Sequence, residues 1–435
     1  MTQVLALDVG TSAVRAQRFD ERCRSAGELA RRMYVGVTDA DELAAAARAA
    51  IAEAGGADGV DAVGVSCFGH SLLPLDRRGR PLTPILGWRD PRAVDAARKL
   101  RQKLDADAVF ARTGAPLHPS FWPAKLVWLG ANDAALYVTF AEYLYMHLLG
   151  AEPRMSLSSA SGTGVFNLRT RAWDEELLDV LGLDPRRLPP VTDEATASWQ
   201  PALMDGACAN IGAGAVGETR GAITVGTSCT LRRVYDARDP QPRPGLFLYL
   251  VDGRRVVEGG ALSDGGNLFH WANRTLADNT ASLLERGPDE HGLTFLPFLG
   301  GERSTGWRLQ ARGSVHGLTF ETTPRDVRQA ALEGIGFRLA AVLELLPEVE
   351  ELIATGSVLV HNREWMQLTA DALARPLTTG HGEASLRGAA VTALAALGVS
   401  PEPPELGPVI EPRAELVDAY AAARERHRRL YDAAT

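Results

Sequence analysis

The sequence has no stretch approaching the roughly 20 apolar residues that a membrane-spanning helix needs. Its first ten residues, MTQVLALDVG, lack the basic flank and the long apolar core of a signal peptide. Cys23, Cys67, Cys208 and Cys229 are scattered, with no Cys-x-x-Cys spacing that would indicate a metal site. These absences predict a cytoplasmic protein whose cysteines are reduced thiols.

Basic residues are too few to make a surface for nucleic acid. Lysine and arginine number 46 against 54 acidic residues, which gives a formal net charge of −8. A polyanionic partner is therefore not expected. The motif G-x-x-x-x-G-K-[ST] is also absent, which excludes a P-loop kinase. An ordinary hydrophobic share of 46% and a length of 435 residues predict a globular enzyme with two large domains.

One short pattern occurs twice. Residues 8–20 read DVGTSAVRAQRFD, and residues 224–236 read TVGTSCTLRRVYD. In both copies apolar residues precede Val-Gly-Thr-Ser, and a polar-apolar alternation follows, which predicts a β-hairpin with a Gly-Thr-Ser turn. The repeat predicts two related halves, which we place at residues 1–217 and 218–435. Because no low-complexity linker separates them, we expect the halves to meet along a cleft.

Apolar periodicity predicts strands that alternate with helices, an α/β fold. In the first half, helices are expected at 41–54 and 91–104 and a buried strand at 62–67. In the second half, strands are expected around Val256 and at 294–299, and helices at 325–346, 363–374, 385–397 and 414–434.

The Gly-Thr-Ser turns suit phosphate binding, because Gly allows close backbone approach and the hydroxyls and amides donate hydrogen bonds. The residues concerned are Gly10, Thr11, Ser12, Gly226, Thr227 and Ser228. Asp8, at the end of the first strand, stands where a carboxylate could hold Mg²⁺ directly or through water. Either turn alone could be simply a turn. Residues 212–217 match the dinucleotide pattern G-x-G-x-x-G, but no strand precedes them, so we interpret them as close packing or an interdomain turn.

Several longer motifs resemble those of the FGGY carbohydrate kinase family, and most closely its gluconokinase-type members. The resemblance runs from Leu5 to about Gly398. Its motifs are DVGTSAVRA, GHSLLPLD, PLTPILGWRDPRA, RTGAPLHPSFWPAKLVWL, ASGTGVFNL, MDGACANIGAGA, LPFLGGER, LEGIGF and ATGSVLVHNREWMQLTAD. The resemblance implies two actin-like, ribonuclease H-like domains around a central cleft. It also implies ATP and Mg²⁺ as cofactors and phosphorylation of a sugar or sugar acid, with D-gluconate as the expected substrate.

The resemblance makes Asp205 the catalytic base, since phosphoryl transfer requires a group that accepts the proton of the attacking hydroxyl. It places Arg15, Gly356, Ser357 and Asn362 at the nucleotide. Outside this context an Asp-Gly pair would be read as a turn.

The substrate-recognition segments contain four further candidates. Trp88 could cover sugar C–H groups, and Asp90 could accept from hydroxyls, although Asp90 followed by Pro91 also reads as a helix N-cap. His70 could donate to the substrate or be structural. Lys125, Arg89 or Arg92 could bind a gluconate carboxylate, although a solvated Lys125 fits the spacing equally well.

Some positions depart from the family pattern. Ser12-Ala13 replaces Thr-Ser, Ser357 replaces a glycine, and Cys229 replaces a small residue. A ketose or polyol kinase for xylulose or glycerol, or a catalytically weak sugar-binding homologue, therefore stays open. For the assembly, a homodimer is one candidate.

Overall fold

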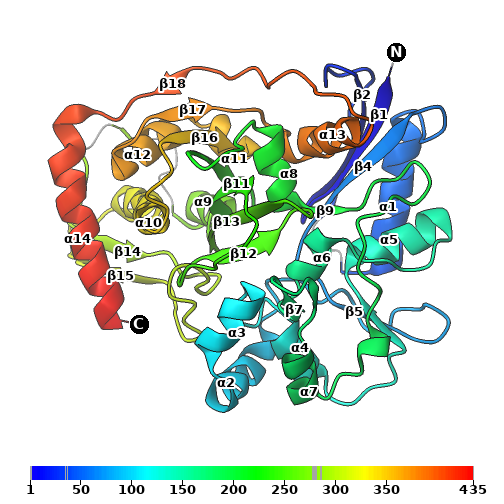
Figure 1. Ribbon diagram of the computed structural model, residues 1–435. Helices are drawn as coiled ribbons and strands as arrows, with labels where there is room; N and C mark the ends of the chain where they lie inside the picture. The colour runs from blue at the N-terminus through cyan, green and yellow to red at the C-terminus, as the bar shows by residue number, and fades with distance from the viewer. Residues whose placement is uncertain (1, 35, 37, 277–281, 285–286, 435) are drawn as a thin grey trace.

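Two β-sheets form the framework of the computed structural model, which describes residues 2–34, 36, 38–276, 282–284 and 287–434 (Figure 1). The first sheet has five strands in the order β3-β2-β1-β4-β9, and the second has seven in the order β12-β13-β11-β10-β16-β17-β18. The first comprises β1 (Gln3–Val9), β2 (Ala13–Asp20), β3 (Ala30–Met33), β4 (Ala62–Cys67) and β9 (Leu203–Met204). The second comprises β10 (Arg220–Val225), β11 (Cys229–Asp236), β12 (Phe247–Leu250), β13 (Arg255–Leu262), β16 (Glu351–Thr355), β17 (Leu377–Thr379) and β18 (Val409–Ile410).

The two sheets repeat one topology. In the first, β1 pairs antiparallel with β2 and parallel with β4, β2 pairs antiparallel with β3, and β4 pairs parallel with β9. In the second, β10 pairs antiparallel with β11 and parallel with β16, β11 pairs antiparallel with β13, and β16 pairs parallel with β17. The expected repetition of two related halves is confirmed at the level of strand order and direction.

Helices cover the sheets and fill the space beside them. In the first half they are α1 (Ala40–Glu53), α2 (Val94–Lys103), α3 (Ala106–Thr113), α4 (Trp122–Leu129), α5 (Phe140–Leu149), α6 (Leu157–Ser161), α7 (Glu175–Leu181) and α8 (Asp205–Gly212). In the second they are α9 (Gly266–Thr275), α10 (Pro324–Glu344), α11 (Ser357–Val360), α12 (Arg363–Leu373), α13 (Ala384–Ala396) and α14 (Val417–Ala434). Short two-stranded pairs complete the fold: β5 (Leu73–Leu75) with β6 (Leu136–Val138), β7 (Phe166–Asn167) with β8 (Ala172–Trp173), and β14 (Thr294–Leu296) with β15 (Ser314–His316).

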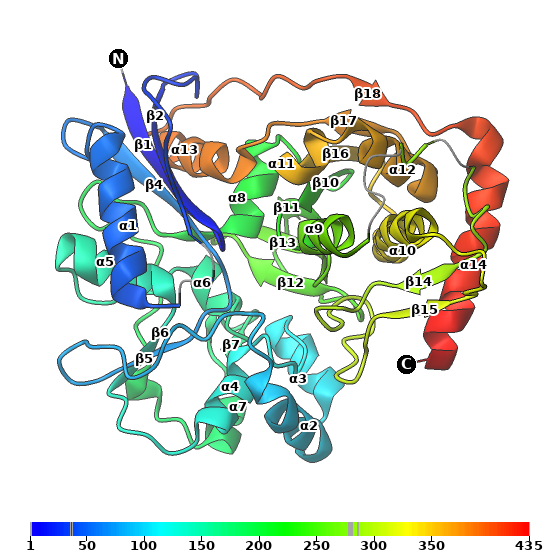
Figure 2. The ribbon, with the colours of Figure 1, turned by 180° about the vertical axis from the view of Figure 1, so that it is seen from behind.

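Helices α8 and α13 cross at close range between the two sheets (Figures 1 and 2). A Cβ atom at Gly212 would lie 1.9 Å from the carbonyl oxygen of Ala384, and one at Gly388 would lie 1.9 Å from that of Cys208. Only glycine permits this approach, because a Cβ atom cannot lie so close to a carbonyl oxygen. Gly212, the first residue of the run at 212–217, thus serves close packing, which is one of the two interpretations given for that run. Helix α13 lies late in the sequence, yet it contacts β1 and β4 of the first sheet.

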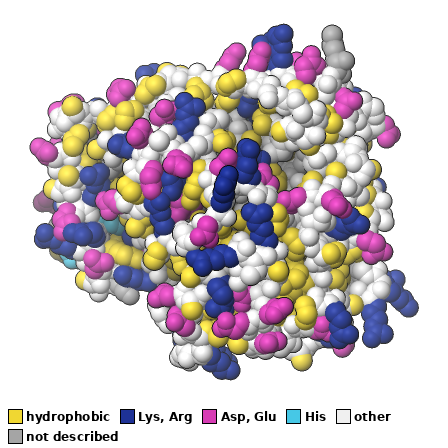
Figure 3. All heavy atoms as spheres, viewed as in Figure 1, with side chains coloured by type: hydrophobic (Ala, Val, Ile, Leu, Met, Phe, Trp, Pro, Cys, Tyr) yellow, Lys and Arg dark blue, Asp and Glu magenta, His cyan; other side chains and the backbone are white. Residues whose placement is uncertain are grey.

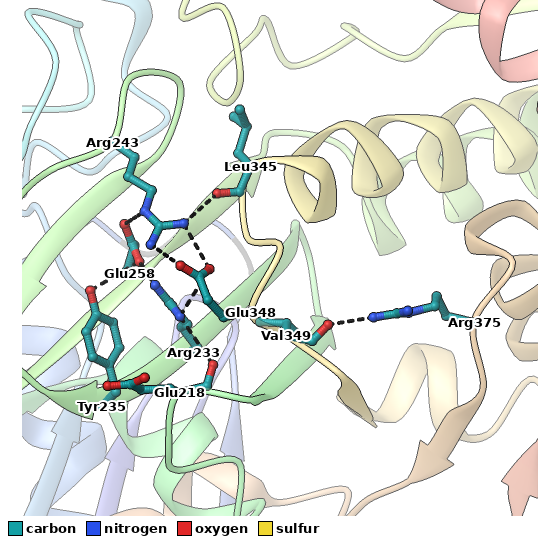
Figure 4. A network of polar contacts seen from close by, with 9 residues as sticks. All are labelled: Glu218, Arg233, Tyr235, Arg243, Glu258, Leu345, Glu348, Val349 and Arg375. Carbon is teal, nitrogen blue, oxygen red and sulfur yellow. Dashed lines mark hydrogen bonds and ion pairs between the residues drawn. The ribbon is translucent and has the colours of Figure 1, made fainter.

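A buried ion network holds part of the second half together (Figure 4). Glu258 is fully buried on β13, and its Oε2 accepts from Nε and Nη2 of Arg233 at 3.0 and 2.8 Å. Arg243 approaches the other carboxylate oxygen at 3.3 Å and also pairs with Glu348. A buried carboxylate is tolerated where it is paired and hydrogen-bonded in this way.

The predicted elements match the structure closely where periodicity was long. The strand at 62–67 is β4, and the helices at 41–54, 325–346, 363–374 and 385–397 are α1, α10, α12 and α13. Three expectations were wrong in detail. The helix at 414–434 begins as a 3₁₀ turn (Ala414–Leu416), and α14 starts at Val417. The helix at 91–104 begins as a 3₁₀ turn (Pro91–Ala93) before α2, and the strand at 294–299 ends at Leu296, where Pro297 interrupts it.

Charged side chains of both signs are interspersed on the face seen in Figure 3. None of the helices in the described ranges combines the length and the apolar character that crossing a membrane requires. All four cysteines are free and buried.

Candidate functional site

The first hairpin ends β1 and begins β2 through the three-residue turn Gly10–Ser12. The Gly10 amide donates to the Ala13 carbonyl at 3.0 Å, and the Tyr34 hydroxyl donates to the Gly10 carbonyl. Gly10 and Thr11 line a cavity of about 330 Å³ that extends to Trp88 and Asp90. The phosphate turn and the predicted substrate segment therefore share one hollow.

Asp8 lies beside this hairpin, 3% exposed. Its carboxylate accepts from Ser66 Oγ at 2.7 Å and from Arg15 Nη1 at 3.0 Å. Burial raises the pKa of Asp8 to about 6, against the lowering effects of Arg15 and Ser66, and the negative charges of Asp205 and Glu383 add to the rise.

The residues around Asp8 fit a magnesium ion bound together with phosphates. Within the described part of the chain, no group of three His, Cys, Asp or Glu side chains could hold a metal ion alone. Mg²⁺ bound with ATP needs only one or two carboxylates, since phosphates and water fill the remaining positions. The negative charge of Asp205 contributes to the raised pKa of Asp8, and a cation bound at Asp8 would oppose this contribution.

The second hairpin is supported by glycines from two neighbouring segments. The amides of Gly266 and Asn267, at the start of α9, donate to the carbonyls of Gly226 and Thr227 at 3.0 Å each. Gly356 follows β16 with a φ of +85°, and a Cβ atom there would lie 2.3 Å from the Val225 carbonyl oxygen. Gly356 is thus required beside the turn, whereas Ser357 is exposed and its Cβ meets no such crowding.

Asn362, expected at the nucleotide, caps α12. Its Oδ1 accepts from the Trp365 amide at 3.0 Å. This N-cap role explains an amide at that position by local structure.

Asp205 begins α8 and lies in a small cavity of about 80 Å³ between the two halves. The cavity brings together His70, Trp88 and Asp205 from the predicted set. Burial raises the pKa of Asp205, while the positive charges of Arg232 and Arg303 oppose the rise. A carboxylate with a raised pKa that lines a cavity between the two halves is suited to accept a proton.

The second half adds residues that sequence analysis missed. They are Thr230 and Arg232 on β11, Tyr249 on β12, and Arg303. Arg232 Nη2 donates to Thr224 Oγ1 at 2.9 Å, and Arg303 Nη2 donates to the Leu262 carbonyl at 2.8 Å. Both lay within quoted motifs, Arg232 in the second repeat and Arg303 in LPFLGGER. Only their position across the cleft distinguishes them from other arginines.

His70 is neutral and acts differently from the prediction that it donates to the substrate. Its Nδ1 lies 2.7 Å from the Gly162 carbonyl, so Nδ1 must carry the proton and donate. Burial lowers the pKa of His70 to about 3. The remaining ring nitrogen, Nε2, is then an acceptor, suited to a hydroxyl and unsuited to a carboxylate.

The structure places Asp90 as a cap. Its Oδ1 accepts from the Arg92 amide at 3.0 Å and from Arg92 Nε at 2.9 Å. The N-cap interpretation is confirmed, and Asp90 also lines the 330 Å³ cavity. Because Arg92 is bound to Asp90, it is not free to bind a substrate carboxylate, whereas Arg89 is exposed.

The solvated alternative for Lys125 is wrong, since the residue is 1% exposed. Its Nζ donates to the carbonyls of His70 and Leu86, at 2.5 and 3.1 Å. Burial lowers the pKa of Lys125 to about 7. Lys125 therefore ties together the two segments that carry His70 and Trp88.

Comparisons with known proteins agree with this geometry. The model of the N-terminal domain of the FGGY family of carbohydrate kinases matches residues 3–211, and that of the C-terminal domain matches residues 221–397. A gluconokinase of Bacillus subtilis (strain 168) is 29% identical, over 76% of this chain and 73% of the relative. A glycerol kinase of Acidovorax sp. (strain JS42) is 31% identical, over 90% of this chain and 91% of the relative.

A solved structure shares the fold along its whole length. The ligand-bound xylulose kinase from Lactobacillus acidophilus has a TM-score of 0.88 at 24% identity, covering 100% of this chain and 98% of that chain. At this identity the likeness concerns the fold.

Proposed function

The chain belongs to the FGGY family of carbohydrate kinases, and on this premise we propose that it transfers the γ-phosphate of ATP to the terminal hydroxyl of D-gluconate, giving 6-phosphogluconate. The chain has the two-domain, actin-like fold of this family and is a sugar kinase, a phosphotransferase that acts on an alcohol group. The sugar acid is the proposal.

One observation carries the choice of an acid. The cavity of Asp205 is lined by two guanidinium groups, those of Arg232 and Arg303, each only 7% exposed. Buried cations are costly unless anions compensate them; the charge of Asp205 acts on both guanidinium groups, and Asp264, whose pKa burial raises to about 7, acts on Arg303. An anionic acceptor would complete the charge balance, whereas a neutral ketose or polyol would not.

The proposed chemistry uses Asp205 as the base. The terminal hydroxyl donates its proton to the Asp205 carboxylate as its oxygen attacks the γ-phosphorus, and the bond to the leaving ADP oxygen breaks. Trp88 would cover the carbon face of the sugar, and His70 Nε2 would accept from a hydroxyl. Mg²⁺, held through Asp8, would neutralise charge on the phosphates.

The nucleotide would lie between the two hairpins. We propose that Gly10, Thr11, Ser12 and Arg15 contact phosphates from one side, and that Gly226, Thr227, Ser228, Gly356 and Ser357 line the other. Asn362 would support this region by fixing the start of α12. The domain limits 1–217 and 218–435, a cytoplasmic location and a homodimer stay predictions.

A coupled ADP-release assay over aldonates, ketoses and polyols tests the proposal. Gluconate should give the highest kcat/KM, with the 6-phosphate as product. If xylulose or glycerol stimulates ADP release while gluconate does not, the choice of a sugar acid is wrong and the ketose or polyol alternative holds. If no acceptor stimulates it, a weak sugar-binding homologue is favoured.

A further inference from the structure

Arg303 meets Trp88 across the boundary between the halves. Trp88 belongs to the first half, and Arg303 follows β14 in the second. The guanidinium carbon of Arg303 lies 4.1 Å from the centre of the Trp88 ring, within the range of a cation–π contact. Both side chains line the cavity of Asp205, so this contact forms part of its wall.

Polar atoms in this wall lack protein partners. Arg303 Nε, Arg232 Nε and Thr230 Oγ1 are buried without a hydrogen bond. Buried polar groups in native proteins are normally satisfied, and a bound ligand is one way to satisfy them. Three such atoms around one cavity point to a ligand that carries oxygen acceptors.

Arg303 keeps its charge at neutral pH. Burial lowers its pKa to about 10, while Tyr249, Asp264 and Asp205 act in the opposite direction. A planar guanidinium whose face rests on an aromatic ring offers its edge to a carboxylate.

The segment that carries Arg303 is firmly held. The neighbouring Glu302 is 2% exposed, and its Oε1 accepts from the Tyr431 hydroxyl at 2.6 Å and from Arg338 Nη2 at 3.0 Å. Its Oε2 accepts from the Arg308 amide at 3.2 Å. Helix α14 thus anchors the segment through Tyr431, so the position of Arg303 is set before a substrate arrives.

We propose that Arg303, positioned over the Trp88 ring, binds the carboxylate of the acceptor and is the main determinant of selectivity for sugar acids over neutral sugars. The proposal rests on the proposed function and deepens it. Four other cations fit this role less well. Arg89 lies 5.5 Å from the centre of the same Trp88 ring, but it is exposed and is not among the residues that line the Asp205 cavity. The amine of Lys125 is bound to two carbonyls, Arg92 is bound to Asp90, and Arg232 lies against the turn that contains Asp205, 2.5 Å from where a Cβ of Gly206 would be.

Because recognition comes from the second half, binding of the acid would also draw the halves together. The carboxylate would contact Arg303 of one half while the terminal hydroxyl contacts Asp205 of the other. A neutral acceptor would lack the first contact, so its transition state would be less well bound.

The test compares D-gluconate with D-gluconamide, which replaces the carboxylate by a neutral amide of nearly the same shape. In the wild type, gluconate should have a kcat/KM about 10- to 100-fold above gluconamide, as expected when a charged hydrogen bond is made. Arg303→Gln should lose this preference because its kcat/KM for gluconate falls, while its kcat/KM for gluconamide changes by less than about threefold. Arg303→Lys, which keeps the charge without the plane, should keep part of the preference.

Arg312→Gln is the matched control, since it removes an exposed arginine from the same segment. It should leave the ratio of the two acceptors unchanged. Gluconamide turnover also reports whether each variant is folded. If Arg303→Gln lowers kcat/KM equally for gluconate and for gluconamide, Arg303 has a structural role. The inference is then wrong, while the proposed function stands. If the wild type phosphorylates no sugar acid, both the proposed function and the role of Arg303 are wrong. The wild-type assay alone shows this outcome.

Discussion

Replacing Asp205 by Asn tests the proposed base with little change of shape. The amide keeps the volume of the carboxylate but cannot accept the proton of the attacking hydroxyl. A positioned general base contributes about 10²- to 10⁴-fold to the rate, which corresponds to roughly 3–5 kcal/mol in the barrier. The structure favours the upper part of this range, because Asp205 is also the carboxylate next to Arg232 and Arg303.

The assay measures sugar-dependent ADP release at saturating ATP, together with ATP affinity by calorimetry. Asp205→Asn should lower kcat by at least about 10²-fold and change the ATP affinity by less than about threefold. Asp184→Asn, at the N-cap of the 3₁₀ turn Pro185–Arg187 and outside the set of residues that line the Asp205 cavity, is the control and should retain full activity. Activity of Asp205→Asn within tenfold of the wild type would refute the role of Asp205 as the base.

The pH dependence follows from the same residue. Because the pKa of Asp205 is raised from its ordinary value of 3.8, the deprotonated base is lost on acidification at a higher pH than for an exposed aspartate. Wild-type kcat/KM should therefore fall on the acidic side of its pH profile.

Three further variants test other parts of the account. Lys125→Met should raise the KM for gluconate and for a neutral polyol alike, roughly tenfold, because its amine ties backbone segments together. Glu258→Ala should lower the free energy of unfolding by about 3–5 kcal/mol, since it removes the buried carboxylate that Arg233 binds and leaves this buried arginine its longer contact with Glu348 at 3.4 Å, whereas Glu351→Ala in an exposed pair should cost less than about 1 kcal/mol. Glu142→Gln should flatten the pH dependence of unfolding between pH 4.5 and about 7.

The sign for Glu142 follows from its burial, which raises its pKa from 4.5 to about 7. Between these values the folded state binds more protons than the unfolded state, so the wild type loses up to about 3 kcal/mol as the pH rises. A wild-type curve that is flat or rises in this window contradicts the assignment. For Lys125→Met, a rise in the KM for gluconate alone would instead support a direct contact between Lys125 and the substrate carboxylate. For Glu258, a loss equal to that of the exposed pair would show that the network contributes little.

The sequence predicted what depends on local pattern. The two Gly-Thr-Ser turns, β4 and the long helices were placed correctly, because periodicity and turn residues act over short distances. The N-cap at Asp90 was visible for the same reason.

What depends on long-range packing was missed. In the sequence Lys125 cannot be told from a solvent-exposed lysine. Only the structure shows that it is buried and that its amine links two segments by binding the carbonyls of His70 and Leu86. Arg303 lies more than 200 residues from Trp88, yet the fold places one on the other. The close crossing of α8 and α13 likewise depends on two glycines that are far apart in the chain.

The most direct test of the central claim is the wild-type kcat/KM for D-gluconate, measured beside xylulose and glycerol with ATP as the phosphate donor. The account predicts the highest value for gluconate and 6-phosphogluconate as the product. A higher value for xylulose or glycerol, with gluconate near background, would contradict it.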